Sequence, residues 1–326
     1  MERLNAFDIR ELERLCPGGV KENVSLAAIS RWQIGGTADV IVEPSSVAEL
    51  CSLRAFIAQE GLPSVVIGDT SNLLFSDEGL RAVCIRLGSR MSSVHIENDI
   101  VHAQAGVWVP FLARKIMSAG LTGAEHTCGI PGTLGGLICM NGGSQRKGVG
   151  SSVVTVESVD TAGNICHRSV EQCEFSYRSS VYQNNSEVIA SAKLSFLSGD
   201  KLKIRQEMLS ILAERNRKFP RKLPNCGSVF KSNPAMYEKA GPPGAIIESL
   251  GFKGACCGGA QVSPHHANFI VNTGVARARD VLTLVSKISR CVLESVGHHI
   301  EPEFKFVSVH GEIMPVDEML KGFFYE

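Results

Sequence analysis

The most glycine-rich stretch of this sequence is the one most able to hold an anion. It reads Gly129-Ile130-Pro131-Gly132-Thr133-Leu134-Gly135-Gly136. Glycines at this spacing let the backbone turn tightly and bring N–H groups against an anion such as a pyrophosphate. The stretch is neither a Walker A loop, since no Gly-Lys-Ser/Thr follows, nor the G-x-G-x-x-G of a dinucleotide-binding unit. Two interpretations stay open, an anion-binding loop and a structural turn, and spacing alone favours the turn.

A second stretch with polar donors follows a short apolar run and reads Gly68-Asp69-Thr70-Ser71-Asn72. A strand that ends at glycine, with serine and asparagine beyond it, can present hydroxyl, amide and N–H donors to a phosphate. A β-turn closed by a short polar side chain explains the same residues, and is the better interpretation of this stretch alone.

Three segments carry side chains that could act on a substrate. Arg178 follows Tyr177, and a guanidinium can hold an oxyanion while the tyrosine bonds the same ligand. Ser228 follows a glycine and could donate a proton, although no G-x-S-x-G elbow supports serine-hydrolase chemistry. Glu301 and Glu303 flank a proline, and one of them could be an acid if burial raised its pKa. Each residue alone is also explained as a surface or turn residue.

Cysteine and histidine do not form a recognisable metal site. The 11 cysteines include no C-x-x-C pair, and the His265-His266 and His298-His299 pairs have no third ligand at a suggestive spacing. A disulfide framework is unexpected in a chain with enough apolar residues for a core. We therefore expect reduced, mostly buried thiols and no metal.

Charge and composition exclude several classes of protein. The 33 Lys and Arg residues balance 33 Asp and Glu residues, so a general nucleic-acid or anionic-membrane binder is not expected. The content of 44% apolar and 20% charged residues is that of a globular protein. The charged N-terminal stretch lacks the apolar core of a signal peptide, and no apolar run approaches the roughly 18 residues of a membrane helix. We expect a soluble cytoplasmic protein.

Hydrophobic periodicity predicts the elements that position these stretches. Helical spacing occurs over 47–57 and short apolar strands over 64–67, 82–86, 100–105, 153–160 and 188–196, which indicates an α/β first half. A charged helix through 204–212 should end before Pro220, with a domain boundary near residue 200. An amphipathic helix over about 276–296 should stop at Gly297. Residues 307–326 show no strong pattern.

The order of these motifs along the chain resembles the UDP-N-acetylmuramate dehydrogenase family, also named UDP-N-acetylenolpyruvoylglucosamine reductase. The resemblance covers about residues 25–306. Its motifs are Ile34-Gly35-Gly36, Gly68 to Asn72, Gly123 to Glu125 with Gly129 to Gly136, Met140-Asn141, Phe175 to Arg178, Cys226 to Lys231, Ala245 to Glu248, Gly259 to Ser263, His266 to Asn272 and Glu301 to Glu303.

The resemblance implies an α+β protein with an FAD-binding fold of the vanillyl-alcohol-oxidase (PCMH) type, made of two α/β lobes, and a C-terminal α/β substrate-binding domain. The implied bounds are 1–30 for an N-terminal segment, 31–198 for the FAD-binding domain, 199–306 for the substrate domain and 307–326 for a tail. FAD would be bound non-covalently and reduced by NADPH. The product would be UDP-N-acetylmuramate, a peptidoglycan precursor, and the protein would be a monomer or weak oligomer.

The same resemblance implies a role for each site residue. Arg178 would stabilise the enolate formed on the substrate, Glu303 would be paired with it, and Ser228 would be the general acid. Tyr177, Lys231, Asn233 and His266 would bind the substrate. FAD would be held by Ile34, Gly35, Gly36, Gly68, Asp69, Thr70, Ser71, Asn72, Gly129, Ile130, Pro131, Gly132, Thr133, Gly135, Gly136 and Asn141.

Three departures from the family pattern bear on ligand contacts. Thr70 stands where the loop usually has glycine, which predicts added bulk beside the pyrophosphate. Residues 142–148 read Gly-Gly-Ser-Gln-Arg-Lys-Gly in place of Ala-Gly-Ala-Tyr-Gly, and Ser232 is inserted before Asn233. These departures leave open a paralogue that acts on another sugar nucleotide. A non-catalytic flavin-binding protein is a further alternative.

Overall fold

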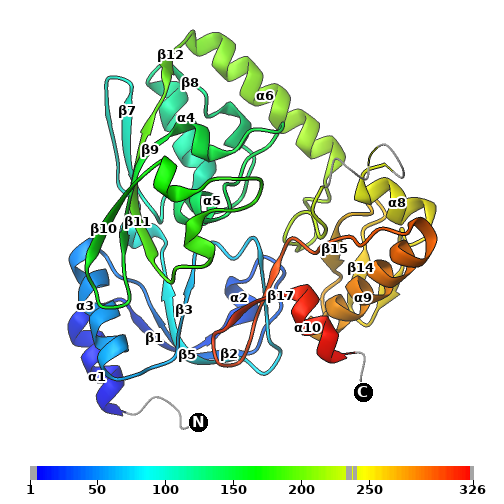
Figure 1. The fold of residues 1–326 in the computed structure, drawn as a ribbon, viewed down its shortest axis with the longest axis horizontal. Helices are drawn as coiled ribbons and strands as arrows, with labels where there is room; N and C mark the ends of the chain where they lie inside the picture. Colours follow the sequence, from blue (N-terminus) through cyan, green and yellow to red (C-terminus); the bar gives the residue numbers. More distant parts are fainter. Residues whose placement is uncertain (1–5, 233–236, 238–240, 324–326) are drawn as a thin grey trace. The chain divides into compact units, whose positions relative to one another are not determined.

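The computed structural model describes residues 6–232, 237 and 241–323 (Figure 1). The chain forms two compact units, and each takes residues from several parts of the sequence. Unit 1 comprises Met1–Glu22, Val40–Asp69 and Val83–Arg215, and unit 2 comprises Asn23–Asp39, Thr70–Ala82 and Asn216–Glu326. The predicted domain bounds, which are continuous in sequence, stay a prediction.

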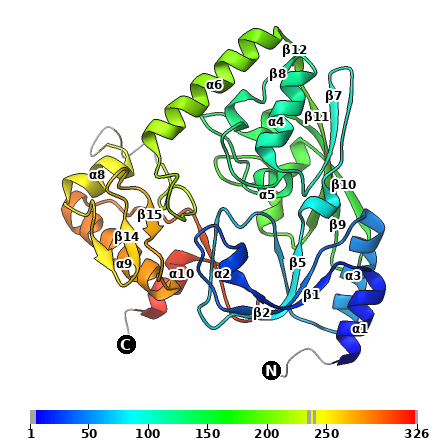
Figure 2. The ribbon, with the colours of Figure 1, turned by 180° about the vertical axis from the view of Figure 1, so that it is seen from behind.

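Unit 1 is built on a five-stranded sheet whose order is β10-β9-β11-β7-β6. All its pairs are antiparallel: β6–β7 and β9–β10 are hairpins, and the long connection from β7 to β9 contains α4 and α5. Figures 1 and 2 show α4 and α5 on one face of this sheet. Its elements are α1 (Ala6–Leu15), α3 (Val47–Gln59), β3 (Ser64–Ile67), β6 (Val94–Glu97), β7 (Ile100–Gln104), α4 (Val109–Ser118), β8 (Leu121–Thr122), α5 (Leu134–Cys139), β9 (Val153–Val159), β10 (Ile165–Ser169), β11 (Val188–Ser195) and β12 (Leu197–Ser198).

Unit 2 contains two three-stranded sheets, β13-β14-β15 and β17-β16-β4. The long helix α9 packs against β13 and β14. Figure 2 shows α9 beside β14. Its elements are α2 (Leu26–Ile29), β4 (Leu73–Phe75), α8 (Pro243–Ser249), β13 (Cys256–Cys257), β14 (Ala260–Val262), β15 (Ile270–Asn272), α9 (Ala278–Val296), β16 (Lys305–Val307), β17 (Ile313–Pro315) and α10 (Val316–Phe323).

Four elements contain residues of both units. They are β1 (Val20–Ser25), β2 (Thr37–Val42), β5 (Leu80–Arg86) and helix α6 (Lys201–Lys218). The three strands belong to a sheet of order β1-β2-β5-β3, in which β3 and β5 run parallel.

The elements predicted from periodicity are confirmed with shifts of a few residues at their ends. Helix α3 covers the predicted 47–57, β3 matches 64–67, and α9 ends at Gly297, which has a left-handed φ of 66°. Each unit has its own apolar core. All eleven cysteines, which lie within the described ranges, are free, but only five of them are buried. The expectation of mostly buried thiols is therefore half right.

The C-terminal segment is more ordered than its sequence pattern indicates. Strand β17 pairs antiparallel with β16, and Val316 and Leu320 of α10 are buried in the core of unit 2. The described residues include no helix long and apolar enough to cross a membrane.

Candidate active site

The glycine-rich loop 129–136 is fixed in unit 1 by main-chain pairing. Val109 N–H donates to the Gly132 carbonyl at 2.9 Å, and Leu134 N–H donates to the Val107 carbonyl at the same distance. Thr133 then caps α5, since its hydroxyl accepts from Gly136 N–H at 3.5 Å. The conformation of the loop is therefore fixed by hydrogen bonds within the protein.

The same loop fits a phosphate-bearing cofactor such as FAD. Among the described residues, the N–H groups of Gly132 and Thr133 have no hydrogen-bond acceptor. A Cβ on Gly136 would meet only the Thr133 hydroxyl, at 3.7 Å, so this side of the backbone is open to a ligand. Gly68 lies directly against Thr133, where a Cβ would overlap the threonine hydroxyl. Free N–H groups beside side-chain-free backbone suit a diphosphate.

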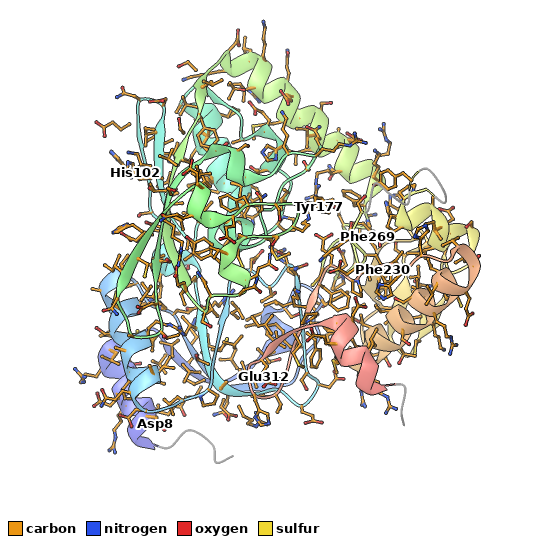
Figure 3. All side chains as sticks on the ribbon, viewed as in Figure 1. Asp8, His102, Tyr177, Phe230, Phe269 and Glu312 are labelled. Carbon is orange, nitrogen blue, oxygen red and sulfur yellow. The ribbon has the colours of Figure 1, made fainter. Side chains whose placement is uncertain are left out.

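Asn141, Tyr177 and Arg178 also lie together in unit 1. The Asn141 amide donates to the Ser176 carbonyl at 2.8 Å, which ties the residue after α5 to the segment that carries the arginine. The Arg178 guanidinium lies over the Tyr177 ring, 5.3 Å from its centre. Tyr177 is 58% exposed and is labelled in Figure 3, and an exposed ring beside a guanidinium can bind a planar or anionic ligand.

Thr70 is buried within unit 2, and its predicted effect on a pyrophosphate stays a prediction. It is 3% exposed, and its hydroxyl accepts from Arg31 N–H at 3.0 Å and donates to the Ile29 carbonyl at 3.3 Å within unit 2. Its φ of 55° lies in the left-handed region that β-branched residues rarely adopt. The threonine side chain therefore fills a site in the protein, and its hydrogen bonds offset the strain.

The Gly35-Gly36 pair is explained by packing in unit 2. Gly35 has a φ of 132°, and a Cβ on Gly36 would lie 2.5 Å from the Gly79 nitrogen. The neighbouring Ile34 is buried in the core of the unit. Gly36 allows a close approach of two backbones, and Gly35 is required by its φ and by neighbouring side chains. The pair therefore does not by itself indicate a ligand, and its predicted contact with FAD stays a prediction.

Ser228 and Glu303 belong to two paired segments of unit 2. Glu303 N–H donates to the Val229 carbonyl at 2.7 Å, and Lys231 N–H donates to the Glu301 carbonyl at 2.9 Å. Phe230, which lies between Val229 and Lys231, forms an antiparallel bridge with Pro302. The Lys231 ammonium forms an ion pair with the Glu301 carboxylate. The fold therefore brings together a hydroxyl, two carboxylates and a lysine that are about seventy residues apart in sequence.

His266 lies in an aromatic cluster of the same unit, with its ring centre 5.7 Å from that of Phe219 and 5.1 Å from that of Phe269. Phe269 is labelled in Figure 3. Burial lowers its pKa, and its Nδ1 accepts from Asn268 N–H at 3.2 Å. The ring is thus a neutral acceptor packed within the protein, and the predicted contact of His266 with the substrate stays a prediction.

Two asparagines that the sequence reading did not assign to the site hold its segments in place. Asn268 is 7% exposed, its Oδ1 accepts from Phe230 N–H at 3.0 Å, and its Nδ2 donates to the Phe230 carbonyl at 3.0 Å. Asn272 donates to the Trp32 carbonyl at 2.9 Å, just before the Gly35-Gly36 pair. Both lie in the stretch 266–272. An asparagine within an apolar run is the sequence signal that could have identified them, because such a side chain must be hydrogen-bonded when it is buried.

The predicted site residues are divided between the units. Gly68, Asp69, 129–136, Asn141, Tyr177 and Arg178 belong to unit 1. Ile34, Gly35, Gly36, Thr70, Ser71, Asn72, Ser228, Lys231, His266 and Glu303 belong to unit 2. Asn233 lies outside the described residues. Within those residues there is no group of three His, Cys, Asp or Glu side chains that could hold a metal ion.

Comparison with known proteins defines the class of the molecule. Residues 38–169 match the family described as FAD binding domain, and this range contains the loop that fits the cofactor, so the protein is an FAD-dependent flavoprotein. Residues 219–307, which include Ser228 and Glu303, match the family described as UDP-N-acetylenolpyruvoylglucosamine reductase, C-terminal domain. The chain as a whole belongs to the UDP-N-acetylenolpyruvoylglucosamine reductase family.

The relatives match over nearly the whole chain. UDP-N-acetylenolpyruvoylglucosamine reductase 1 of Corynebacterium glutamicum is 44% identical over 296 residues, which cover 91% of this chain and 88% of that protein. The UDP-N-acetylenolpyruvoylglucosamine reductase of Caldanaerobacter subterraneus is 37% identical over 90% of this chain and 96% of its own. The crystal structure of the Thermus caldophilus enzyme of that name matches with a TM-score of 0.74 at 30% identity, covering 87% of this chain and 97% of that one. The α+β fold inferred from the resemblance is thereby confirmed.

Proposed function

We propose that this chain reduces the enolpyruvyl group of UDP-N-acetylglucosamine enolpyruvate to give UDP-N-acetylmuramate, an early step of peptidoglycan synthesis. The observation that carries the proposal is the pairing of the Ser228–Lys231 segment with Glu301–Glu303 in a chain of this reductase family. A protein that only binds a flavin has no need for such a set of side chains. FAD, reduced by NADPH, supplies the hydride when bound.

The side chains of this protein have separate tasks in that reaction. Addition of hydride to one carbon of the enolpyruvyl group leaves negative charge on its carboxylate as an enolate. Arg178, permanently charged and planar, is suited to stabilise that charge. Ser228 is suited to protonate the neighbouring carbon, since the enolate carbon is a much stronger base than water. Glu303 is the third proposed catalytic residue, and it would act on the same enolate as Arg178.

Binding of the polyanionic ligands depends on local groups. The free N–H groups of Gly132 and Thr133 are suited to the FAD diphosphate. Lys231 and Tyr177 are the described candidates for the nucleotide sugar, and Lys231 must exchange Glu301 for a phosphate if it binds directly. We place the reaction in the cytoplasm, because NADPH and a UDP-sugar do not cross a bilayer unaided. A monomer or weak oligomer stays a prediction.

The test follows the flavin spectrum of the purified protein in two half-reactions. NADPH is expected to bleach the flavin, and UDP-N-acetylglucosamine enolpyruvate is expected to restore its colour. Ser228→Ala is expected to bleach normally and to recover at least a hundredfold more slowly, in the range measured for loss of a general acid. Recovery with other enolpyruvyl nucleotide sugars but not this one would support the paralogue, and recovery of Ser228→Ala at the wild-type rate would refute the assigned role.

A further inference from the structure

The segment 142–148, which departs from the family pattern, forms a compact loop directly after Asn141. Val149 N–H donates to the Gly142 carbonyl at 2.9 Å and closes the loop at its base. Lys147 N–H donates to the Ser144 carbonyl at 3.0 Å and closes its tip. A Cβ on Gly143 would overlap the Lys147 carbonyl, so only glycine fits there. These hydrogen bonds and the close contact at Gly143 give the loop a defined conformation.

Ser144 fastens this loop to a buried residue. Its hydroxyl donates to the His126 carbonyl at 2.5 Å, and its N–H donates to His126 Nδ1 at 3.4 Å. His126 is 3% exposed. Burial lowers the pKa of its imidazole, with Lys147 acting in the same direction, so the ring stays neutral and Nδ1 can accept. The serine thus contacts the same residue through two hydrogen bonds.

The residue next to Ser144 contacts the arginine expected to stabilise the enolate. Arg178 Nη2 donates to the Gly143 carbonyl at 3.4 Å. The Arg178 backbone is held separately, because its carbonyl accepts from Gln183 Nε2 at 2.9 Å. The contact with Gly143 therefore acts on the guanidinium, which is the part of Arg178 that faces a ligand in the proposed reaction.

We infer that Ser144 is a positioning residue for Arg178: by fastening the 142–148 loop to His126, it places the Gly143 carbonyl that aims the guanidinium at the substrate carboxylate. The inference rests on the proposed function, since it assigns the orientation of a residue whose role is given there. Planar guanidinium groups bind carboxylates well only in a narrow range of orientations, so a loose Gly143 carbonyl weakens the reaction with the sugar nucleotide.

The test measures the two half-reactions separately in four variants of the holoenzyme. Ser144→Ala removes the hydroxyl, Ser144→Thr keeps it, and Arg178→Ala removes the residue that Ser144 is said to position. Ser151→Ala is the matched control, because its hydroxyl donates to the Gly148 carbonyl at 2.9 Å on the exposed side of the same region. Flavin absorbance reports whether each variant still holds FAD.

Ser144→Ala is expected to slow recovery of the flavin colour by the sugar nucleotide about tenfold, to leave bleaching by NADPH within a factor of two, and to retain FAD. Ser144→Thr is expected to restore most of the loss, and Ser151→Ala is expected to match wild type. If Arg178→Ala slows recovery but Ser144→Ala does not, the positioning inference is wrong and the proposed function stands. If Arg178→Ala does not slow recovery, the role of Arg178 in the proposed function fails first. An equal loss in both half-reactions of Ser144→Ala would show a general structural defect and overturn the inference.

Discussion

Asn72 donates a hydrogen bond from its Nδ2 to the main-chain carbonyl of Glu303 at 3.3 Å, and Lys305 N–H donates to the Asn72 carbonyl at 2.9 Å. The loop 68–72 continues directly into β4, which pairs in parallel with β16 just after Glu303. Asn72, which is predicted to contact FAD, thus also holds the backbone of Glu303, which is predicted to be catalytic. A change at Asn72 should therefore affect the chemistry as well as the cofactor.

For Asn72→Ala we expect slower reoxidation of the flavin by the sugar nucleotide, by about a factor of ten, because Glu303 loses a direct support. The measurement is the rate at which the sugar nucleotide restores flavin absorbance, with FAD content determined in the same sample. Full FAD content with an unchanged recovery rate would show that Glu303 does not depend on this hydrogen bond.

For Asn268→Ala we expect a loss of about 2–4 kcal/mol in the free energy of unfolding. The substitution leaves the buried N–H and carbonyl of Phe230 without their side-chain partner, and each unsatisfied group costs about 1–3 kcal/mol. Urea denaturation measures the change. Asn164→Ala is the matched control, because its amide contacts Asp160 at an exposed turn, and we expect a loss below about 1 kcal/mol there.

For Thr70→Val we expect a loss of about 1–3 kcal/mol in the free energy of unfolding, because the new side chain has the same shape but lacks the hydroxyl that bonds Arg31 N–H and the Ile29 carbonyl. Thr70→Ser keeps the hydroxyl and removes the β-branch from a left-handed residue, so its stability should stay within about 1 kcal/mol of wild type. Thermal or urea unfolding compares the two. Equal losses would mean that the hydroxyl does not stabilise this turn.

The stability of the protein should fall as pH drops below the ordinary histidine pKa of 6.5. Burial is the largest cause that lowers the pKa of His126, the charge of Lys147 lowers it further, and the charge of Glu125 opposes both effects. The unfolded chain therefore binds the proton more tightly, so stability is fully present above pH 6.5 and is lost as pH falls through the pKa of the folded state. In His126→Gln, urea unfolding between pH 7.5 and 5 should show a shallower loss. The loss should not vanish, since burial also lowers the pKa of His266.

For Arg178→Lys we expect reoxidation by the sugar nucleotide to fall about a hundredfold while NADPH still bleaches the flavin at the wild-type rate. Lysine keeps the charge but has no planar fork, so it cannot hold an enolate carboxylate through two parallel bonds. Stopped-flow absorbance separates the two steps. A loss confined to the NADPH step would place Arg178 at the nucleotide reductant.

Local patterns were enough to predict the elements whose signal lies within one turn or one strand. Helix α9 repeats its apolar residues at helical spacing and ends at a glycine, and β3 is a short apolar run that ends at Gly68. The family resemblance then supplied the fold and the site residues, which no single motif could. The structure pairs the Ser228 segment with the Glu303 segment, and the catalytic roles of the two residues stay predictions.

The structural roles of Thr70, Asn268 and Ser144 could not be predicted in this way, because each depends on a partner distant in sequence. The hydroxyl of Thr70 bonds residues 29 and 31, so the side chain faces the protein, and its effect on a pyrophosphate stays a prediction. Strand β17 is only three residues long, too short for a periodic signal, and it is formed by pairing with β16.

The pairing of β4 with β16 also sets the order in which the protein can be completed during its synthesis. Asn72 and Glu303 are 231 residues apart, so the ribosome must add the intervening chain before β4 has its partner. At bacterial elongation rates of about 5–20 residues per second, that interval is roughly 10–50 s. Throughout it, β4 is made but has no β16 to pair with, so its backbone edge is open to contact with other chains.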